Sequence, residues 1–188
     1  MLGILYAALG SFTFALNNVA MRRGVVTGSV LQGMALTVPI GGLSFLVMTI
    51  AFGEPAELLM FPAAALTWLA CQGVVHFVIG RYCNYKSNQL MGVNLTAPVV
   101  QLQVPVAMML AVLTLHEKFT MLQAIGSALM LGGSFITQGN AGKGKNASAP
   151  EPRPKPAFKP RVLRGYSFAL GAAMCYGSSP LMARQAFL

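Results

Sequence analysis

Residues 105–136 read PVAMMLAVLTLHEKFTMLQAIGSALMLGGSFI, two apolar runs joined by the short polar segment HEKF at 116–119. Neither run contains an acidic or a basic residue. A bilayer core about 30 Å thick is crossed by roughly 20 apolar residues in helical conformation. With the apolar residues that flank it, this stretch predicts a helical hairpin that crosses a membrane twice, over residues 94–115 and 119–137.

The rest of the chain has the same character. Of its 188 residues, 55% are hydrophobic and only 9% are charged, whereas an ordinary soluble domain carries about 25% charged residues. Further apolar runs predict spans at 2–21, 29–52, 62–90 and 165–188. Because an open sheet would leave backbone groups unpaired in lipid, we expect an all-α, polytopic transmembrane helix bundle.

The basic residues indicate topology rather than nucleic-acid binding. The net charge is +9, but seven of the thirteen basic residues lie within residues 138–164 and most others lie at the ends of apolar runs. This is the pattern of juxtamembrane charge that sets orientation. It predicts no nucleic-acid partner, a cytoplasmic location for residues 138–164 and an N-terminus on the outer side.

Residues 138–164, QGNAGKGKNASAPEPRPKPAFKPRVLR, separate two unequal parts of the chain. Their glycine, proline and charge predict a linker, because such a segment buries little apolar surface. The last run, 165–188, resembles the first: setting residue 3 over residue 165 matches Gly3 with Gly165 and Arg22 with Arg184. A five-helix unit followed by a second copy is a transporter device, in which the odd number of spans inverts the copy.

The segment HEKF invites a metal-site interpretation that its spacing does not support. A zinc protease helix needs His-Glu-x-x-His, but Thr120 stands where the second histidine belongs, and the other histidine, His76, lies forty residues earlier. The three cysteines match no zinc or redox spacing. We therefore expect no metal, no cofactor and no catalytic residues, and interpret HEKF as a turn.

Polar residues inside the spans are costly and usually face a bundle interior or a cavity. On the fourth span Asn94, Pro98, Gln101 and Pro105 share one face at helical spacing, and on the first span Tyr6, Gly10, Thr13 and Asn17 do the same. Either stripe alone is also compatible with helix packing. Together they favour a shared polar cavity.

The third span carries a group of cationic and aromatic residues. At helical angles His76 and Lys86 lie on one side, while Arg81 and Tyr85 lie nearer the other. One interpretation is a mouth that attracts an anionic or zwitterionic substrate. The other is that the long side chains reach the membrane interface. The sequence leaves both open.

From Pro105 to Ile136 the chain resembles the end of the EamA repeat of the drug/metabolite transporter superfamily. Pro105 leads one span, Glu117 stands in the turn, and Gly126 and Gly132 lie in the next span. The resemblance implies structural roles for these residues and for Pro98. It also implies a ten-helix architecture of two inverted repeats, of which residues 1–137 are one repeat and 165–188 the first helix of a truncated second. In addition, Ala124, Ala128 and Gly132 form a small-residue ridge that predicts close helix packing.

The resemblance implies a multi-pass transporter of the inner membrane. No acidic residue lies in any predicted span, so proton-for-cation exchange is disfavoured and a small neutral, zwitterionic or anionic metabolite is expected, moved by alternating access. The expected substrate contacts are Asn17, Thr13, Gln101, Asn94, Lys86, Arg81, Tyr85 and His76. The alternative is a non-transporting membrane scaffold or accessory subunit. Expected partners are the metabolite, the lipid bilayer, and a second repeat or a homodimer partner. Members of the resembled family usually keep the N-terminus inside, which conflicts with the charge pattern.

Overall fold

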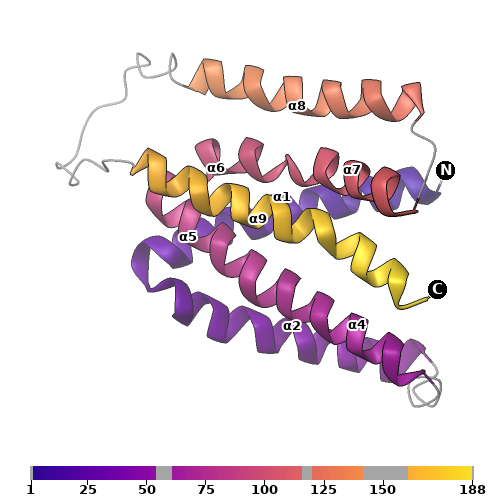
Figure 1. Ribbon diagram of the computed structural model, residues 1–188. Coiled ribbons are helices and arrows are strands. Elements are labelled where there is room, and N and C mark those ends of the chain that lie inside the picture. Colours follow the sequence, from indigo (N-terminus) through magenta and orange to yellow (C-terminus); the bar gives the residue numbers. More distant parts are fainter. Residues whose placement is uncertain (1, 54–60, 116–119, 142–160, 188) are drawn as a thin grey trace.

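The computed structural model describes residues 2–53, 61–115, 120–141 and 161–187, and all regular structure in them is helical (Figure 1). The elements are α1 (Leu2–Thr27), α2 (Val30–Phe52), α4 (Ala63–Gly73), the π-helix η1 (Val74–Gly80), α5 (Arg81–Met91), α6 (Val93–Val100), α7 (Gln103–Leu115), α8 (Met121–Ala141) and α9 (Val162–Gln185). The predicted all-α membrane helix bundle is confirmed.

Three of the described helical stretches are long and apolar enough to cross a membrane. They are Val30–Phe52, Ala63–Met91 and Val93–Leu115, and a fourth apolar stretch, Met121–Gly133, is shorter. The second combines α4, η1 and α5 without a break, and the third combines α6 and α7. Large apolar side chains cover the outside, as with Phe45, which is 68% exposed. Such a surface suits lipid rather than water.

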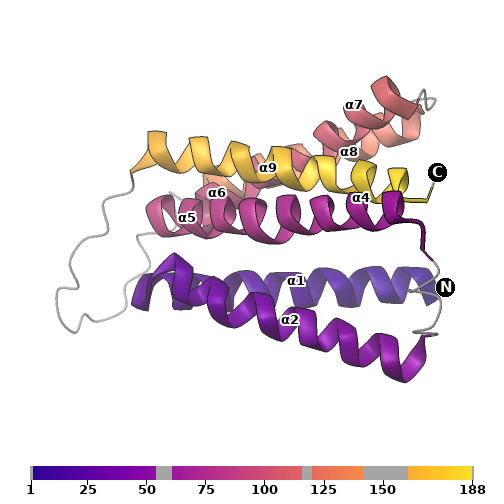
Figure 2. The ribbon, with the colours of Figure 1, turned by 60° about the horizontal axis from the view of Figure 1, so that its bottom comes forward.

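Helix α9 packs against α4, η1, α5, α6 and α7, and α4 and α5 lie between it and the pair α1 and α2 (Figures 1 and 2). Its small residues allow this close approach: a Cβ at Gly177 would lie 2.6 Å from Val106 Cγ1, and one at Gly165 would lie 2.8 Å from the Met91 side chain. From the other side, a Cβ at Gly80 would lie 2.8 Å from the Tyr176 ring. Because packing in lipid depends on close contact between backbones, these glycines allow α9 to pack directly against the neighbouring helices.

Helices α1 and α2 form a second packing unit with α5. Met21 and Val25 of α1, Val30 and Met34 of α2, and Tyr85 of α5 make one buried cluster. Figure 2 shows α1 and α2 side by side, with both chain ends at the same end of the bundle. Helix α9 therefore runs antiparallel to α1, which is the relation that inverted repeats require.

Helix α8 packs only loosely on the bundle: it contacts α6, and Ser127 Oγ donates to Met108 Sδ of α7 at 3.0 Å (Figure 1). At Gly132, the glycine of the predicted small-residue ridge, no heavy atom lies within 4 Å of a built Cβ, so this position makes no close contact with the described residues. The helix starts with a capping pair instead: Thr120 N donates to Gln123 Oε1 at 3.0 Å, and Gln123 N donates to Thr120 Oγ1 at 3.4 Å. Glu117 lies outside the described residues.

Several helices continue past the predicted bounds. Helix α1 extends to Thr27 rather than stopping at the two arginines, because Arg22 Nη1 donates to the main-chain oxygen of Asn88 and so has a partner inside the bundle. Helix α8 enters the predicted linker as far as Ala141, and α9 begins at Val162. The remainder of the linker lies outside the described residues.

Candidate functional site

The polar face of α5 is buried among apolar helices. Asn84, Ser87 and Asn88 are 9%, 0% and 1% exposed, and Ser87 and Asn88, three and four residues after Asn84, share its face of the helix. Buried polar groups in a membrane protein must find partners within the bundle. Those partners define the site.

Asn88 is held in one orientation by its neighbour one turn earlier. Its Nδ2 donates to the main-chain oxygen of Asn84 at 2.9 Å and to Asn84 Oδ1 at 2.8 Å. Two acceptors on this side mean that the nitrogen, and not the oxygen, faces Asn84. Asn88 Oδ1 is buried and has no hydrogen-bond partner among the described residues. An unpaired buried carbonyl is costly, so this oxygen is a candidate ligand contact.

Ser87 joins three helices beside it. Its hydroxyl donates to the main-chain oxygen of Gly165 in α9 at 2.9 Å and lies 3.0 Å from Thr96 Oγ1 in α6. Both hydroxyl-bearing residues are fully buried. The network therefore fixes the relative positions of α5, α6 and α9 and makes a rigid floor for the site.

A small cavity of about 30 Å³, here called the amide pocket, opens between α1, α5 and α6. Its polar lining consists of Asn18, Asn84, Asn88, Thr96, Gln101 and Gln103, and its apolar lining of Phe14, Val93, Ala97 and Val100. This volume holds one or two water molecules. All six polar residues are neutral, so the pocket offers donors and acceptors without net charge.

The pocket lies where the fourth span is interrupted. Helix α6 ends at Val100 and α7 begins at Gln103. Proline at 105 removes the donor that would normally pair with the carbonyl of Gln101, and Val104 N takes its place at 3.1 Å. Discontinuous spans of this kind form substrate and ion sites in transporters. Gln101, at the end of α6, lines the amide pocket together with residues of α1 and α5.

The structure separates the residues that the sequence placed on shared stripes. Gln101 lines the amide pocket, but Asn94 is exposed on α6. On α1 it is Asn18 that reaches this pocket, while Asn17 lines a second cleft. Thr13 is exposed and its hydroxyl donates to main-chain oxygens of its own helix. The hydroxyl of Thr13 therefore has hydrogen-bond partners without any ligand.

The cationic and aromatic residues predicted on the third span contact different helices. Tyr85 is buried, and its hydroxyl lies 3.2 Å from Thr37 Oγ1 of α2. Arg81 shares the second cleft with Asn17. His76 instead packs against the ring of Tyr176 in α9, at 4.7 Å between centroids.

Lys86 does not face either cavity. Its Nζ donates to Gln89 Oε1 at 2.9 Å, one turn along the same helix. Gln89 Nε2 in turn donates to the main-chain oxygen of Val25 at 3.1 Å. Lys86 therefore belongs to the packing between α5 and α1, and the four polar residues do not form a single mouth.

The sequence interpretation missed Asn84 and Asn88. Both lie within RYCNYKSNQLM at 81–91. From this segment the sequence interpretation selected only the charged and aromatic residues as candidate substrate contacts. A usable signal was present, since Asn84, Ser87 and Asn88 share a helical face at spacings of three and four. Uncharged polar residues on one face of a span are as informative as charged ones, because both must be satisfied in the bundle.

The fold and the pocket together define a class: a multi-pass helical membrane protein with a buried polar site at a broken span, as transporters have. A family model agrees with this class. Residues 1–138 match the EamA-like transporter family, and the chain belongs to that family, a family of membrane transporters in the drug/metabolite transporter superfamily. No curated protein matches the chain, and no solved structure does.

Proposed function

We propose that the chain serves the transport of a small neutral, zwitterionic or anionic metabolite across the inner membrane by alternating access, with the amide pocket as part of the substrate path. The observation that carries the proposal is the buried Asn88 Oδ1, which has no partner among the described residues and belongs to a pocket at a helix interruption. A passing substrate with a hydrogen-bond donor would satisfy it.

The chemistry of the pocket supports the substrate class. Amide groups both donate and accept hydrogen bonds, so they suit neutral and zwitterionic groups as well as anions. A proton-coupled exporter of cations needs a carboxylate, but the four glutamates of the chain lie at 54, 57, 117 and 151, outside every predicted span. The pocket itself is lined by uncharged residues only.

The packing supports movement of one part of the bundle against another. Phe14 and Asn18 form the α1 side of the pocket, while the other lining residues come from α5, α6, α7 and the turn between the last two. Helix α9 packs on α4 to α7, whereas α1 packs on α2 and α5. A rocking motion that moves α1 away from α6 would open the pocket from one side.

The test is a comparison of small molecules inside and outside cells that express the chain, followed by flux into liposomes for each compound that changes. Gln101→Leu removes a pocket amide at similar size and is expected to abolish the change. Thr114→Val is the control, because Thr114 is exposed on α7 and its hydroxyl bonds to the main chain of its own helix. Equal flux for Gln101→Leu and the unmodified chain would refute the assigned path. A correctly inserted chain that changes no compound would favour the scaffold alternative.

A further inference from the structure

Arg81 is a cation inside a membrane-spanning stretch. It lies within Ala63–Met91, at the point where η1 passes into α5, and it is half-buried. No acidic residue occurs among the described residues, so none of them neutralises it. Its one described ring contact is with Phe77, whose centroid lies 5.5 Å from the guanidinium carbon. An unneutralised charge in a span is costly and usually has a function.

The backbone around Arg81 is specialised. Seven residues, Val74–Gly80, form a π-helix, and the N–H of Arg81 donates to the carbonyls of His76 and Val78. The bond to His76 spans five residues, which is the π-helical register. Within this segment His76 packs against the rings of Tyr176 in α9 and of Phe77, and Phe77 and Arg81 line a cleft. Short π-helical segments occur frequently at functional sites.

The cleft that Arg81 lines has a polar end and an apolar wall. It has a volume of about 460 Å³ and lies between α1, α2 and the η1–α5 junction. Asn17 and Thr37 contribute an amide and a hydroxyl to the same lining as Arg81, and Leu36, Ile40 and Phe45 provide the wall. These three apolar side chains are 64%, 54% and 68% exposed, so the cleft is open on the α2 side. Its size is that of small-molecule sites.

We propose that this cleft, distinct from the amide pocket, binds an amphipathic acid: one acidic head group held by Arg81, with Asn17 and Thr37 beside it, and an apolar body along α2. A guanidinium matches a carboxylate or phosphate with two parallel hydrogen bonds. The single cation favours one acidic group over two. A free amphipathic carboxylate and the head group of an anionic phospholipid share this chemistry.

The experiment measures equilibrium binding of radiolabelled octanoate to the purified full chain in a non-ionic detergent. Octanol has the same apolar body without the acid, and succinate has two acids without the apolar body. Octanoate is expected to bind at least ten times more tightly than either. Arg81→Gln is expected to weaken octanoate binding roughly 10- to 100-fold, which corresponds to the loss of a charge-assisted pair. Arg81→Lys, which keeps the charge but not the planar fork, is expected to bind with intermediate affinity.

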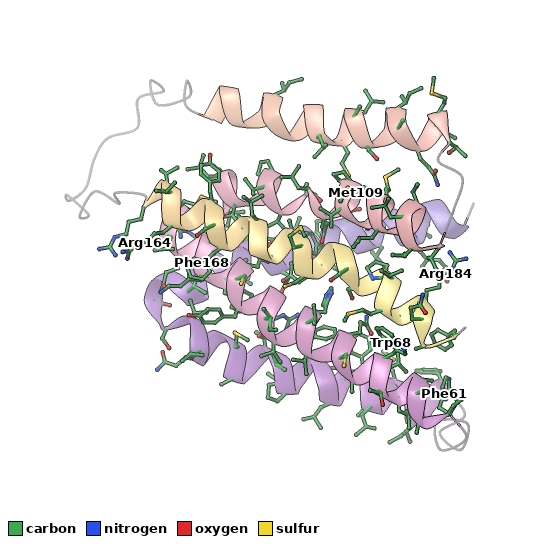
Figure 3. All side chains as sticks on the ribbon, in the orientation of Figure 1. Phe61, Trp68, Met109, Arg164, Phe168 and Arg184 are labelled. Atoms are coloured by element: carbon green, nitrogen blue, oxygen red, sulfur yellow. The ribbon has the colours of Figure 1, made fainter. Side chains whose placement is uncertain are left out.

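The control is Arg164→Gln, because Arg164 is exposed at the start of α9, away from the cleft (Figure 3). It is expected to bind octanoate within twofold of the unmodified chain. Thermal unfolding of each variant by circular dichroism shows that it is folded. Octanol binding as tightly as octanoate, or undiminished binding by folded Arg81→Gln, would overturn the proposal and leave Arg81 as a side chain that reaches the membrane interface. In phosphatidylcholine nanodiscs, displacement of octanoate by added phosphatidylglycerol would identify the lipid as the source of the acid, and failure of displacement would identify a free carboxylate.

Discussion

At the scale of single residues, the Asn88 side chain has two roles, one structural and one in ligand binding, and a substitution can test the structural one. Its Nδ2 satisfies two oxygens of Asn84, while its Oδ1 is left for a ligand. Asn88→Leu keeps the volume but leaves both Asn84 oxygens without this donor. We expect the free energy of unfolding to fall by about 1–3 kcal/mol, measured by thermal or denaturant unfolding in detergent. Asn94→Leu is the matched control, since Asn94 is exposed and its loss is expected to change stability by less than about 0.5 kcal/mol. Equal effects of the two substitutions would contradict this role of Asn88.

The pair Tyr85 and Thr37 tests how α2 is fixed to α5. Their hydroxyl oxygens lie 3.2 Å apart, and Tyr85 is 3% exposed. Tyr85→Phe and Thr37→Val each remove one partner and leave the packing volume almost unchanged. Each is expected to destabilise by about 0.5–1.5 kcal/mol. In a double-mutant cycle the combined variant should lose less than the sum of the two, because the same bond is removed in each. Strict additivity would show that the hydroxyls do not interact.

At the scale of elements, two glycines of α9 differ in how closely the neighbouring helices approach them. A Cβ at Gly177 would lie 2.6 Å from Val106 Cγ1 and 2.9 Å from the main-chain oxygen of Gln103, whereas one at Gly171 would meet only Cys83 Sγ, at 3.5 Å. Gly177→Ala must therefore shift α9 against α7. We expect it to lower the free energy of unfolding by about 1–3 kcal/mol, as overpacking does. Gly171→Ala, on the same helix, is expected to be neutral or to stabilise by up to about 1 kcal/mol, because alanine favours the helix. Unfolding in detergent, followed by circular dichroism, measures both, and the reverse order would refute this account of the packing.

The same scale shows what the sequence predicts and where it stops. Apolar runs of sufficient length predict helices because the bilayer admits few alternatives, and the all-α bundle follows. The side chains that meet in the amide pocket were harder to predict. The fourth-span stripe grouped Asn94 with Gln101, but in the structure Asn94 is exposed on α6 while Gln101 lines the amide pocket. The third-span angles already placed His76 and Arg81 on different sides, but they grouped His76 with Lys86, and the structure gives these two residues different neighbours. Periodicity predicts which side chains share a face of a helix but not which helix packs against that face, and on α1 it is Asn18 rather than Asn17 that reaches the amide pocket.

At the scale of the whole molecule, charge is distributed unequally between the two ends of the bundle. Arg164 and Arg184 lie at opposite ends of α9 (Figure 3), and the two chain ends lie together at the end near Arg184 (Figure 2). In the sequence, Arg164 is the last residue of the basic segment 138–164, which holds seven lysines and arginines. The positive-inside rule retains such an end in the cytoplasm. The rule therefore predicts that both termini are on the outer side.

A pair of reporter fusions tests this orientation. Alkaline phosphatase, which is active only outside the cytoplasm, is fused after Ser148 in one chain and after Leu188 in another, and green fluorescent protein is fused at the same positions in a second pair. We expect fluorescence without phosphatase activity at Ser148, and phosphatase activity without fluorescence at Leu188, because the span predicted at 165–188 lies between them. Replacing Lys143, Lys145, Arg153, Lys155 and Lys159 by glutamine removes charge without touching a described helix. If the charges set the orientation, this variant is expected to show a mixture of both signals at each position. Phosphatase activity at Ser148 in the unmodified chain would instead place the N-terminus in the cytoplasm, as the family resemblance implies.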